Sequence, residues 1–281
     1  MILARGVAGS VPPFSMAFFR WSIVAIGLSP LIVAALRQQP NLLRKEGLGM
    51  AAAGFLGMFV CGGPVYLAGT TTSAINLALI MAMAPLMVLL FSLVMGLEQV
   101  NRWQIIGMII ALSGALLVIL RGNASGAHGL TQGDVLVVFA MLAWAGYTLV
   151  QNRVGAGVSF LARIGMFAAF GAMFSVPFAA FETWSDPSVV LSFKAAKVYL
   201  FAGLVPGLFA YSAYSYFGSA FGALSTSLSM YLGPVVGAVL STIFLGEAPT
   251  MVHLIGGALS LGGMWLGLRR THATRALRPI D

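Results

Sequence analysis

The chain has 281 residues, of which 59% are hydrophobic and only 8% are charged. A water-soluble domain carries about 25% charged residues, so this composition excludes a soluble protein and predicts an integral protein of the lipid bilayer. The net charge of +8 does not indicate nucleic-acid binding, because basic residues collect in the cytoplasmic loops of membrane proteins. The single cysteine, Cys61, excludes a disulfide framework.

In chain order, several apolar stretches are long enough to cross a hydrocarbon core of about 30 Å, which takes about 20 helical residues. They are Pro12–Leu36, Leu48–Gly69, Thr72–Leu97, Trp103–Leu120, Gly133–Gln151, Val158–Phe181, Lys197–Phe217, Ala223–Leu245 and Met251–Leu268. Turn residues and charges interrupt the chain between them. The predicted fold class is therefore an all-α membrane protein.

The second half of the chain repeats part of the first at a constant offset, as Pro85 and Pro234 illustrate. At the same offset Glu98, Gly107, Gly114 and Arg121 recur as Glu247, Gly256, Gly263 and Arg270. Many transporters are built from duplicated blocks of membrane helices, with the substrate site between the halves. We predict a first repeat over residues 1–121, a second over 133–270, and a basic cytoplasmic tail over 271–281.

The start of the chain is short by most of one helix. The span at Gly133–Gln151 has its counterpart before Pro12, where few residues remain. A misplaced start codon or an incomplete sequence, a protein that lacks this helix, and a cleaved signal peptide would each explain this. The signal peptide is disfavoured because residues 1–9 lack an apolar core. With the first helix counted as truncated, about ten transmembrane helices form two five-helix repeats of inverted topology.

The basic residues predict the orientation of the chain in the membrane. One side holds most of them, and by the positive-inside rule it is cytoplasmic and carries both termini. The residues on this side are Arg37, Arg44, Lys45, Arg102, Arg153, Arg269, Arg270, Arg275 and Arg278. Arg121, Lys194 and Lys197 lie on the other side. We expect the protein in the inner membrane of a bacterium.

The chain resembles the bacterial ten-helix EamA-type exporters of the drug/metabolite transporter superfamily. The resemblance covers Arg5 to Arg270 and rests on short motifs present in both copies. They are Pro85, Gly96-Leu97-Glu98, Trp103–Gly107 and Ser113-Gly114, then Pro234, Leu245-Gly246-Glu247, Ile255-Gly256 and Gly262-Gly263. Arg20 after Phe18-Phe19, Gly133-Asp134, and Trp144-Ala145 with Tyr147 fit the same pattern.

Within that family, Leu3–Gly6 and Val11–Phe14 look most like YddG-type exporters of aromatic amino acids. The resemblance implies a secondary exporter of small molecules, without an enzymatic cofactor. Other amino acids such as threonine, cysteine-pathway metabolites and small drugs are alternative substrates within the family. An intramembrane enzyme is a remote alternative, because no nucleophile with a base, metal cluster or carboxylate pair is visible. A non-transporting subunit is also a remote alternative, because a scaffold needs no inverted pair of repeats.

Polar and aromatic residues near the predicted midplane are the candidates for lining a substrate cavity. They are Tyr66, Asn76, Ile80, Met83, Trp144, Tyr147, Tyr211, Tyr214, Ser225 and Ser229. Such a cavity suits a flat, largely apolar molecule held by a few polar groups. The alternative is that the aromatic side chains belong to an interfacial belt. No histidines or cysteines have metal-ligand spacing, so no metal site is predicted.

Two prolines and several glycines have two interpretations each. Pro85 and Pro234 lie within predicted helices and act either as hinges or as static kinks. The Gly107/Gly114 and Gly256/Gly263 pairs predict close helix contacts within the chain, with a homodimer face as the alternative. A monomer or weak homodimer is expected.

The charged residues are predicted mainly to support the fold. Arg20 and Arg163 lie inside helices and are expected to bond helix-end carbonyls, with substrate carboxylate binding as the alternative. Acidic residues occur near helix ends or in loops, which argues against an obvious proton-coupling carboxylate and favours facilitated diffusion.

Overall fold

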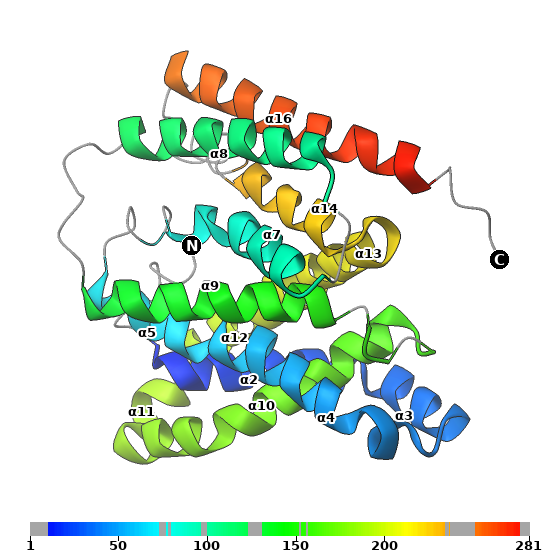
Figure 1. Ribbon diagram of the computed structural model, residues 1–281. Helices are drawn as coiled ribbons and strands as arrows, with labels where there is room; N and C mark the ends of the chain where they lie inside the picture. The colour runs from blue at the N-terminus through cyan, green and yellow to red at the C-terminus, as the bar shows by residue number, and fades with distance from the viewer. Residues whose placement is uncertain are drawn as a thin grey trace.

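The computed structural model describes residues 11–72, 77, 80–96, 100–122, 131–151, 153–155, 157–233, 236 and 251–275. These residues form helices and the turns between them, and no strand occurs in these ranges (Figure 1). This agrees with the predicted all-α fold class.

The helices of the first half are mostly short, with α8 as the longest. They are α2 (Pro13–Gly27), α3 (Ser29–Gln38), α4 (Leu42–Gly54), the π-helix η1 (Phe55–Val60), α5 (Gly63–Thr71), α7 (Ala84–Val94) and α8 (Arg102–Gly122).

The second half contains the longer helices. Its segments are α9 (Gln132–Val150), α10 (Phe160–Ser185), α11 (Pro187–Val190), α12 (Phe193–Ala202), the π-helix η2 (Gly203–Ala210), α13 (Tyr211–Phe221), α14 (Ala223–Leu228), the 3₁₀ turn η3 (Ser229–Tyr231) and α16 (Met251–Arg275).

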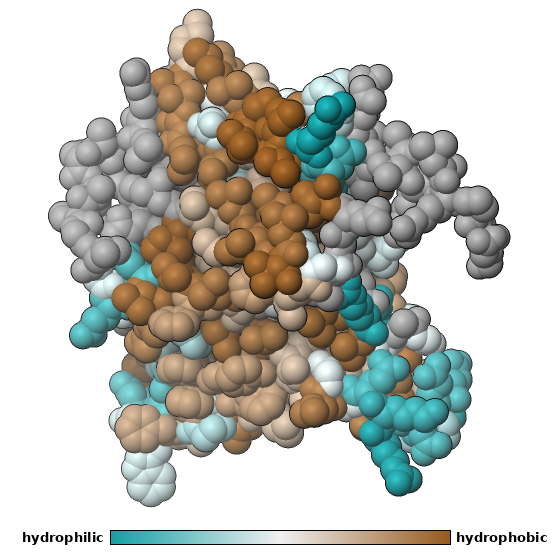
Figure 2. All heavy atoms as spheres, in the orientation of Figure 1, coloured by the Kyte–Doolittle hydropathy of each residue, from teal (hydrophilic) through white to brown (hydrophobic). Residues whose placement is uncertain are grey.

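Several of these helices are long and apolar enough to cross a membrane. Four continuous ones are Leu42–Thr71, Gln132–Val150, Phe160–Ser185 and Phe193–Phe221. Ile80–Val94, Arg102–Leu117 and Leu254–Gly267 are shorter apolar helices. Hydrophobic side chains fill the middle of the face in Figure 2, and hydrophilic ones gather toward its left and right edges. This distribution is that of an integral membrane protein.

The predicted span Pro12–Leu36 consists of two helices rather than one, because α2 and α3 are bent by 59° at a short break. Pro30 lies in the first turn of α3, where it supplies no backbone N–H to continue the preceding helix. The Ser29 hydroxyl donates to the Ile26 carbonyl at 2.7 Å and satisfies one acceptor freed there. Together α2 and α3 are long and apolar enough for one span with a break in it.

Two π-helices occupy equivalent positions in the two halves. η1 begins after Gly54 and η2 begins at Gly203, and these glycines share the offset of the sequence repeat. π-Helices are rare, appear mostly as short bulges, and are frequent at functional sites. Pro206 lies inside η2, and Pro177 lies inside α10.

Helices α8 and α16 lie side by side along their length (Figure 1). A Cβ on Gly107 would lie 2.5 Å from the Gly263 carbonyl oxygen, and one on Gly114 would lie 2.5 Å from that of Gly256. The predicted glycine-mediated contact within the chain is confirmed. These glycine faces are covered by the chain itself.

Because Gly107 is the repeat mate of Gly256 and Gly114 that of Gly263, the contact is reciprocal. Each glycine of one pair meets the mate of the other, so the equivalent helices α8 and α16 run antiparallel. Inverted repeats place equivalent helices in this relation.

Acidic side chains tie helix ends together. The Glu182 carboxylate, at the end of α10, accepts the Phe14 N–H at 3.0 Å and the Ser15 N–H at 2.6 Å in the first turn of α2. Asp134 forms a capping box with Thr131 and accepts the Thr72 hydroxyl, which joins α9 to the end of α5. Negative charge at a helix N-terminus is stabilising.

The other end of the bundle is closed by loop contacts. Glu46 accepts the Gly155 N–H, and the Gln39 amide donates to the Gly157 carbonyl at 2.9 Å. The basic segment around Arg44 therefore lies beside the loop that holds Arg153. Two segments predicted to share the cytoplasmic side are thus neighbours.

Candidate functional site

The predicted aromatic residues of α9 and α13 form one cluster in the interior. Trp144 is surrounded by Tyr147 at 5.5 Å, Tyr211 at 5.5 Å and Tyr214 at 5.0 Å between ring centroids. Tyr147 is fully buried and Tyr211 is 9% exposed. We call Trp144, Tyr147, Tyr211 and Tyr214 the aromatic cluster.

Arg20 connects this cluster to the first half of the chain. It lies midway along α2, is 8% exposed, and donates from Nη1 to the Tyr66 hydroxyl at 2.9 Å. Its guanidinium carbon lies 4.4 Å from the Trp21 ring centroid and 5.4 Å from that of Tyr211. Tyr66, predicted as a cavity residue, is thereby linked to the aromatic cluster through Arg20.

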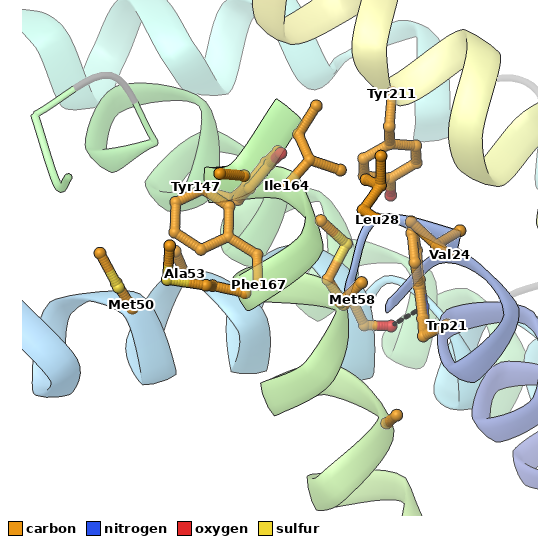
Figure 3. Packing of buried hydrophobic residues seen from close by; sticks show 14 of the residues in the cluster. Trp21, Val24, Leu28, Met50, Ala53, Met58, Tyr147, Ile164, Phe167 and Tyr211 are labelled. Carbon is orange, nitrogen blue, oxygen red and sulfur yellow. Dashed lines mark hydrogen bonds between the residues drawn. The ribbon is translucent and has the colours of Figure 1, made fainter. Parts of the chain in front are cut away.

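The two π-helices supply the backbone acceptors of this region. In η1, the Gly57 carbonyl accepts the Tyr211 hydroxyl at 3.0 Å, and the Met58 carbonyl accepts the Trp21 indole N–H at 2.7 Å (Figure 3). In η2, the Pro206 carbonyl accepts Arg20 Nη2 at 3.3 Å. The wider π turn shifts backbone hydrogen bonds out of α register, and side chains bond the carbonyls here.

Gly57 of η1 lets the ring of Tyr147 approach the backbone. A Cβ on Gly57 would lie 2.5 Å from the Tyr147 ring. Figure 3 shows Tyr147 beside Phe167 and Ala53, in the same buried cluster as Met50 and Ile164. The ring of Tyr147 is therefore held against the first half of the chain.

A polar path leads from the aromatic cluster toward the end of α9. Thr148 Oγ1 lies 3.1 Å from the Tyr214 hydroxyl, and Ser215 donates to Gln151 Oε1 at 2.7 Å. Arg163 donates to the Gln151 carbonyl at 3.2 Å. Among the described residues, Gln151 Nε2 and Arg20 Nε are buried with no hydrogen-bond partner, whereas the Trp144 indole lies next to the Tyr214 hydroxyl and the Tyr147 hydroxyl next to Ser215. Buried polar atoms are normally paired, so the Gln151 and Arg20 donors are available to a ligand or water.

The other predicted cavity residues lie outside this cluster or at its edge. Ile80 packs with Trp144 and Met230 in a neighbouring apolar cluster, and Met83 is half-buried at a turn. Ser225 accepts from Gln104 of α8 at 3.3 Å. Ser229 donates to the Thr226 carbonyl at 2.7 Å. Asn76 lies outside the described residues.

Of the two predicted hinge prolines, only Pro85 is described. It lies in the first turn of α7, directly after the turn at Met83, rather than in the middle of a regular helix. Pro234 lies outside the described residues. At the repeat position of Ile80–Ala82, the other half has the 3₁₀ turn η3. The backbone is irregular at this point in both halves.

A groove of about 570 Å³ opens elsewhere, between α2, α10 and α11. Its lining includes Phe18, Phe19, Val176, Thr183 and Trp184. None of the predicted cavity residues contributes to it. Trp184 is strongly exposed, which suits a position in contact with lipid.

Sequence reasoning missed part of this site. Thr148, Gln151 and Ser215 were not singled out, and Arg20 was expected to bond helix-end carbonyls. The Arg20 acceptor in fact lies within a π-helix in the middle of a span. The signal for Arg20 was present as a single charge inside an apolar helix. Thr148 and Ser215 carry no such signal, because each follows a tyrosine on an otherwise ordinary helical face.

Comparison with known proteins identifies the relatives of this chain. The family model of the EamA-like transporter family matches residues 1–120 and again 131–269. A solved crystal structure of another protein superposes with a TM-score of 0.75 and 20% sequence identity, over 97% of this chain and 92% of the other. That similarity establishes a shared fold.

Curated relatives carry transporter names. An uncharacterized transporter of Archaeoglobus fulgidus is 24% identical over 92% of this chain and 89% of its own length. The uncharacterized transporter YetK of Bacillus subtilis is 25% identical over 95% of this chain and 81% of its own length. A probable terminal-alkyne amino-acid exporter of Streptantibioticus cattleyicolor is 26% identical over 70% of this chain and 65% of its own length.

Proposed function

Because this chain belongs to the EamA-like transporter family, we propose that it exports small metabolites across the bacterial inner membrane, with aromatic amino acids as its preferred substrates. The substrate binds at the aromatic cluster, and the two repeats rock against each other to expose that site to either side in turn. Both termini lie in the cytoplasm, as the distribution of basic residues favours.

The observation that carries this proposal is that Tyr211 contacts both the Arg20 guanidinium, which bonds Tyr66, and the ring of Trp144, which packs on Tyr214. Rings from the second half meet a charged and a hydroxyl group from the first half. Aromatic walls with a few convergent polar groups are the usual composition of a small-molecule site. Rings prefer offset or edge-to-face neighbours, so an aromatic side chain is the natural guest.

A relative supports amino acids as the substrate class. The Streptantibioticus cattleyicolor protein is named as a probable exporter of a terminal-alkyne amino acid. The cluster adds the aromatic preference, which the name of that relative does not contain. Threonine and cysteine-pathway compounds are the alternative substrates.

The positions of the carboxylates support facilitated diffusion. Among the described residues, Glu46, Asp134, Glu182 and Asp186 all bond helix ends or loops. A proton-relay carboxylate lies near the midplane and faces a cavity.

The test is flux through the purified protein in liposomes with no ion gradient. Radiolabelled phenylalanine, tryptophan, threonine and cysteine are compared, and the product is recovered and identified. Saturable uptake of phenylalanine and tryptophan in unchanged form is expected. Uptake of threonine or cysteine alone would contradict the aromatic preference. Chemical conversion would indicate an enzyme, and no flux of any substrate would contradict the transport proposal.

A further inference from the structure

We propose that Arg20 and Tyr66 together bind the carboxylate of the transported substrate. This inference rests on the proposed function and adds the chemical group by which the substrate is recognised. Arg20 would select anions bearing a carboxylate, and the aromatic cluster would select the side chain attached to it.

The charge of Arg20 has no counter-ion among the described residues. A charge inside a membrane span is costly and is normally paired. The described carboxylates Glu46, Asp134, Glu182 and Asp186 are all engaged at helix ends or loops. Arg20 instead has a neutral hydroxyl, a carbonyl and two aromatic faces around it.

The guanidinium of Arg20 also has N–H donors that no described residue accepts. A guanidinium has five N–H groups and no acceptor. Arg20 uses one on Tyr66 and one on the Pro206 carbonyl, and its Nε is buried without a partner. The unused N–H groups include the Nε–H, which forms with an Nη–H the fork that binds a carboxylate through two parallel hydrogen bonds.

The hydroxyl of Tyr66 supplies a second hydrogen-bond donor beside Arg20. The hydroxyl oxygen accepts from Arg20, so its own hydrogen remains available for donation. Tyr66 is 8% exposed and belongs to α5, whereas Arg20 belongs to α2. A carboxylate that accepts from both groups would join two helices of the first half.

The Arg20 guanidinium also lies close to the aromatic cluster. Tyr211 contacts both the guanidinium of Arg20, at 5.4 Å, and the ring of Trp144, at 5.5 Å. The proposed carboxylate site at Arg20 and the ring of Trp144 therefore share one neighbour, the ring of Tyr211. An α-amino acid with an aromatic side chain carries its carboxylate and its ring a few bonds apart, so one molecule can contact both sites.

Arg163 offers a matched control. It is also a buried arginine, is 7% exposed, has an Nε without a described partner, and bonds a backbone carbonyl. It belongs to the first turn of α10 and bonds the Gln151 carbonyl at the end of α9. Replacing either arginine removes one buried charge, but only the Arg20 guanidinium lies beside the Trp21 and Tyr211 rings, whereas Arg163 interacts with Tyr147 and with the carboxylate of Glu46.

The experiment measures equilibrium binding of L-phenylalanine and L-phenylalaninamide to the purified protein, at a pH where both amines are protonated. The amide differs from the acid by the loss of the carboxylate charge. We expect wild type to prefer the acid by about 10-fold or more, since hydrogen bonds between charged groups are strong. Arg20→Gln removes this preference, Arg20→Lys retains part of it, and Arg163→Gln leaves the ratio as in wild type.

The ratio is informative even where a variant binds both ligands weakly, and the wild-type comparison needs no variant. Equal affinity of wild type for acid and amide would overturn the role of Arg20 and leave transport itself untouched. A preference that survives in Arg20→Gln would also overturn it. Absence of binding to both ligands, together with absence of phenylalanine flux, would overturn this inference and the aromatic substrate assignment together.

Discussion

A Cβ atom on Gly263 would lie 2.5 Å from the carbonyl oxygen of Gly107, and one on Gly107 would lie 2.5 Å from that of Gly263. This mutual approach joins α8 and α16, which are equivalent helices of the two halves. The contact is the most direct structural expression of the sequence repeat. This contact between α8 and α16 lies at one edge of the molecule, and the aromatic cluster lies elsewhere in the helix bundle (Figure 1).

Gly107→Ala should lower the free energy of unfolding by about 1–3 kcal/mol, because the methyl group meets backbone atoms that cannot move aside. Gly263→Ala should cost about the same, since the contact is reciprocal. Gly262→Ala is the control, because a Cβ there meets nothing within 4 Å. Thermal unfolding in detergent measures all three. A Gly107→Ala protein as stable as Gly262→Ala would contradict the close contact.

Trp144→Ala should raise the apparent KM for phenylalanine by about 2- to 10-fold, because one aromatic partner of the substrate is lost. Trp184→Ala is the matched control, since Trp184 is 89% exposed and lies in the last turn of α10. Liposome uptake at varied phenylalanine concentration gives both values. Equal KM values in the two variants would remove Trp144 from the site.

Pro85→Ala should slow turnover more than it weakens substrate binding, if Pro85 acts as a hinge. Alanine supplies the N–H that proline lacks, so α7 can continue without the break after Met83. Pro177→Ala, in the interior of α10, is the comparison for a static bend. Uptake rate at saturation and equilibrium binding are measured on the same preparations. A normal rate in Pro85→Ala would leave only the static kink.

Glu182→Gln should destabilise the protein by about 1–2 kcal/mol, because the carboxylate accepts two N–H groups at the start of α2. Asp186→Asn is expected to have a smaller effect, since Asp186 caps only the four-residue α11 and is solvent-exposed. Hydrogen bonds from Ser188 and Val189 lower the pKa of Asp186, so its contribution is lost only as the pH falls below the usual aspartate range. Chemical or thermal unfolding at neutral pH ranks the two variants.

The sequence was informative about composition, repeat and glycine contacts, because these depend on residue type alone. It also selected four rings that the structure brings together, since aromatic residues deep in apolar spans have few other places to go. Their function in substrate binding remains a prediction.

The sequence could not reveal the π-helices, because their formation depends on how α4 and α12 pack rather than on a residue motif. For the same reason it missed the backbone carbonyls that accept Arg20 and Trp21. The bend between α2 and α3 had a signal in Ser29-Pro30, but a proline near the end of an apolar span does not by itself specify an angle.

The central claim is that substrate occupies the aromatic cluster and that this site opens to each side of the membrane in turn. Chemical modification of Cys61, the single cysteine, tests this claim directly. Its thiol donates to the Ala140 carbonyl at 3.2 Å, one turn from Trp144, and a Cβ on its neighbour Gly62 would lie 3.1 Å from the Ala17 Cβ of α2. We predict that a membrane-impermeant thiol reagent modifies Cys61 from either side of sealed liposomes, and that saturating phenylalanine slows both reactions. Reaction rates unaffected by phenylalanine, under conditions where phenylalanine is transported, would contradict the account.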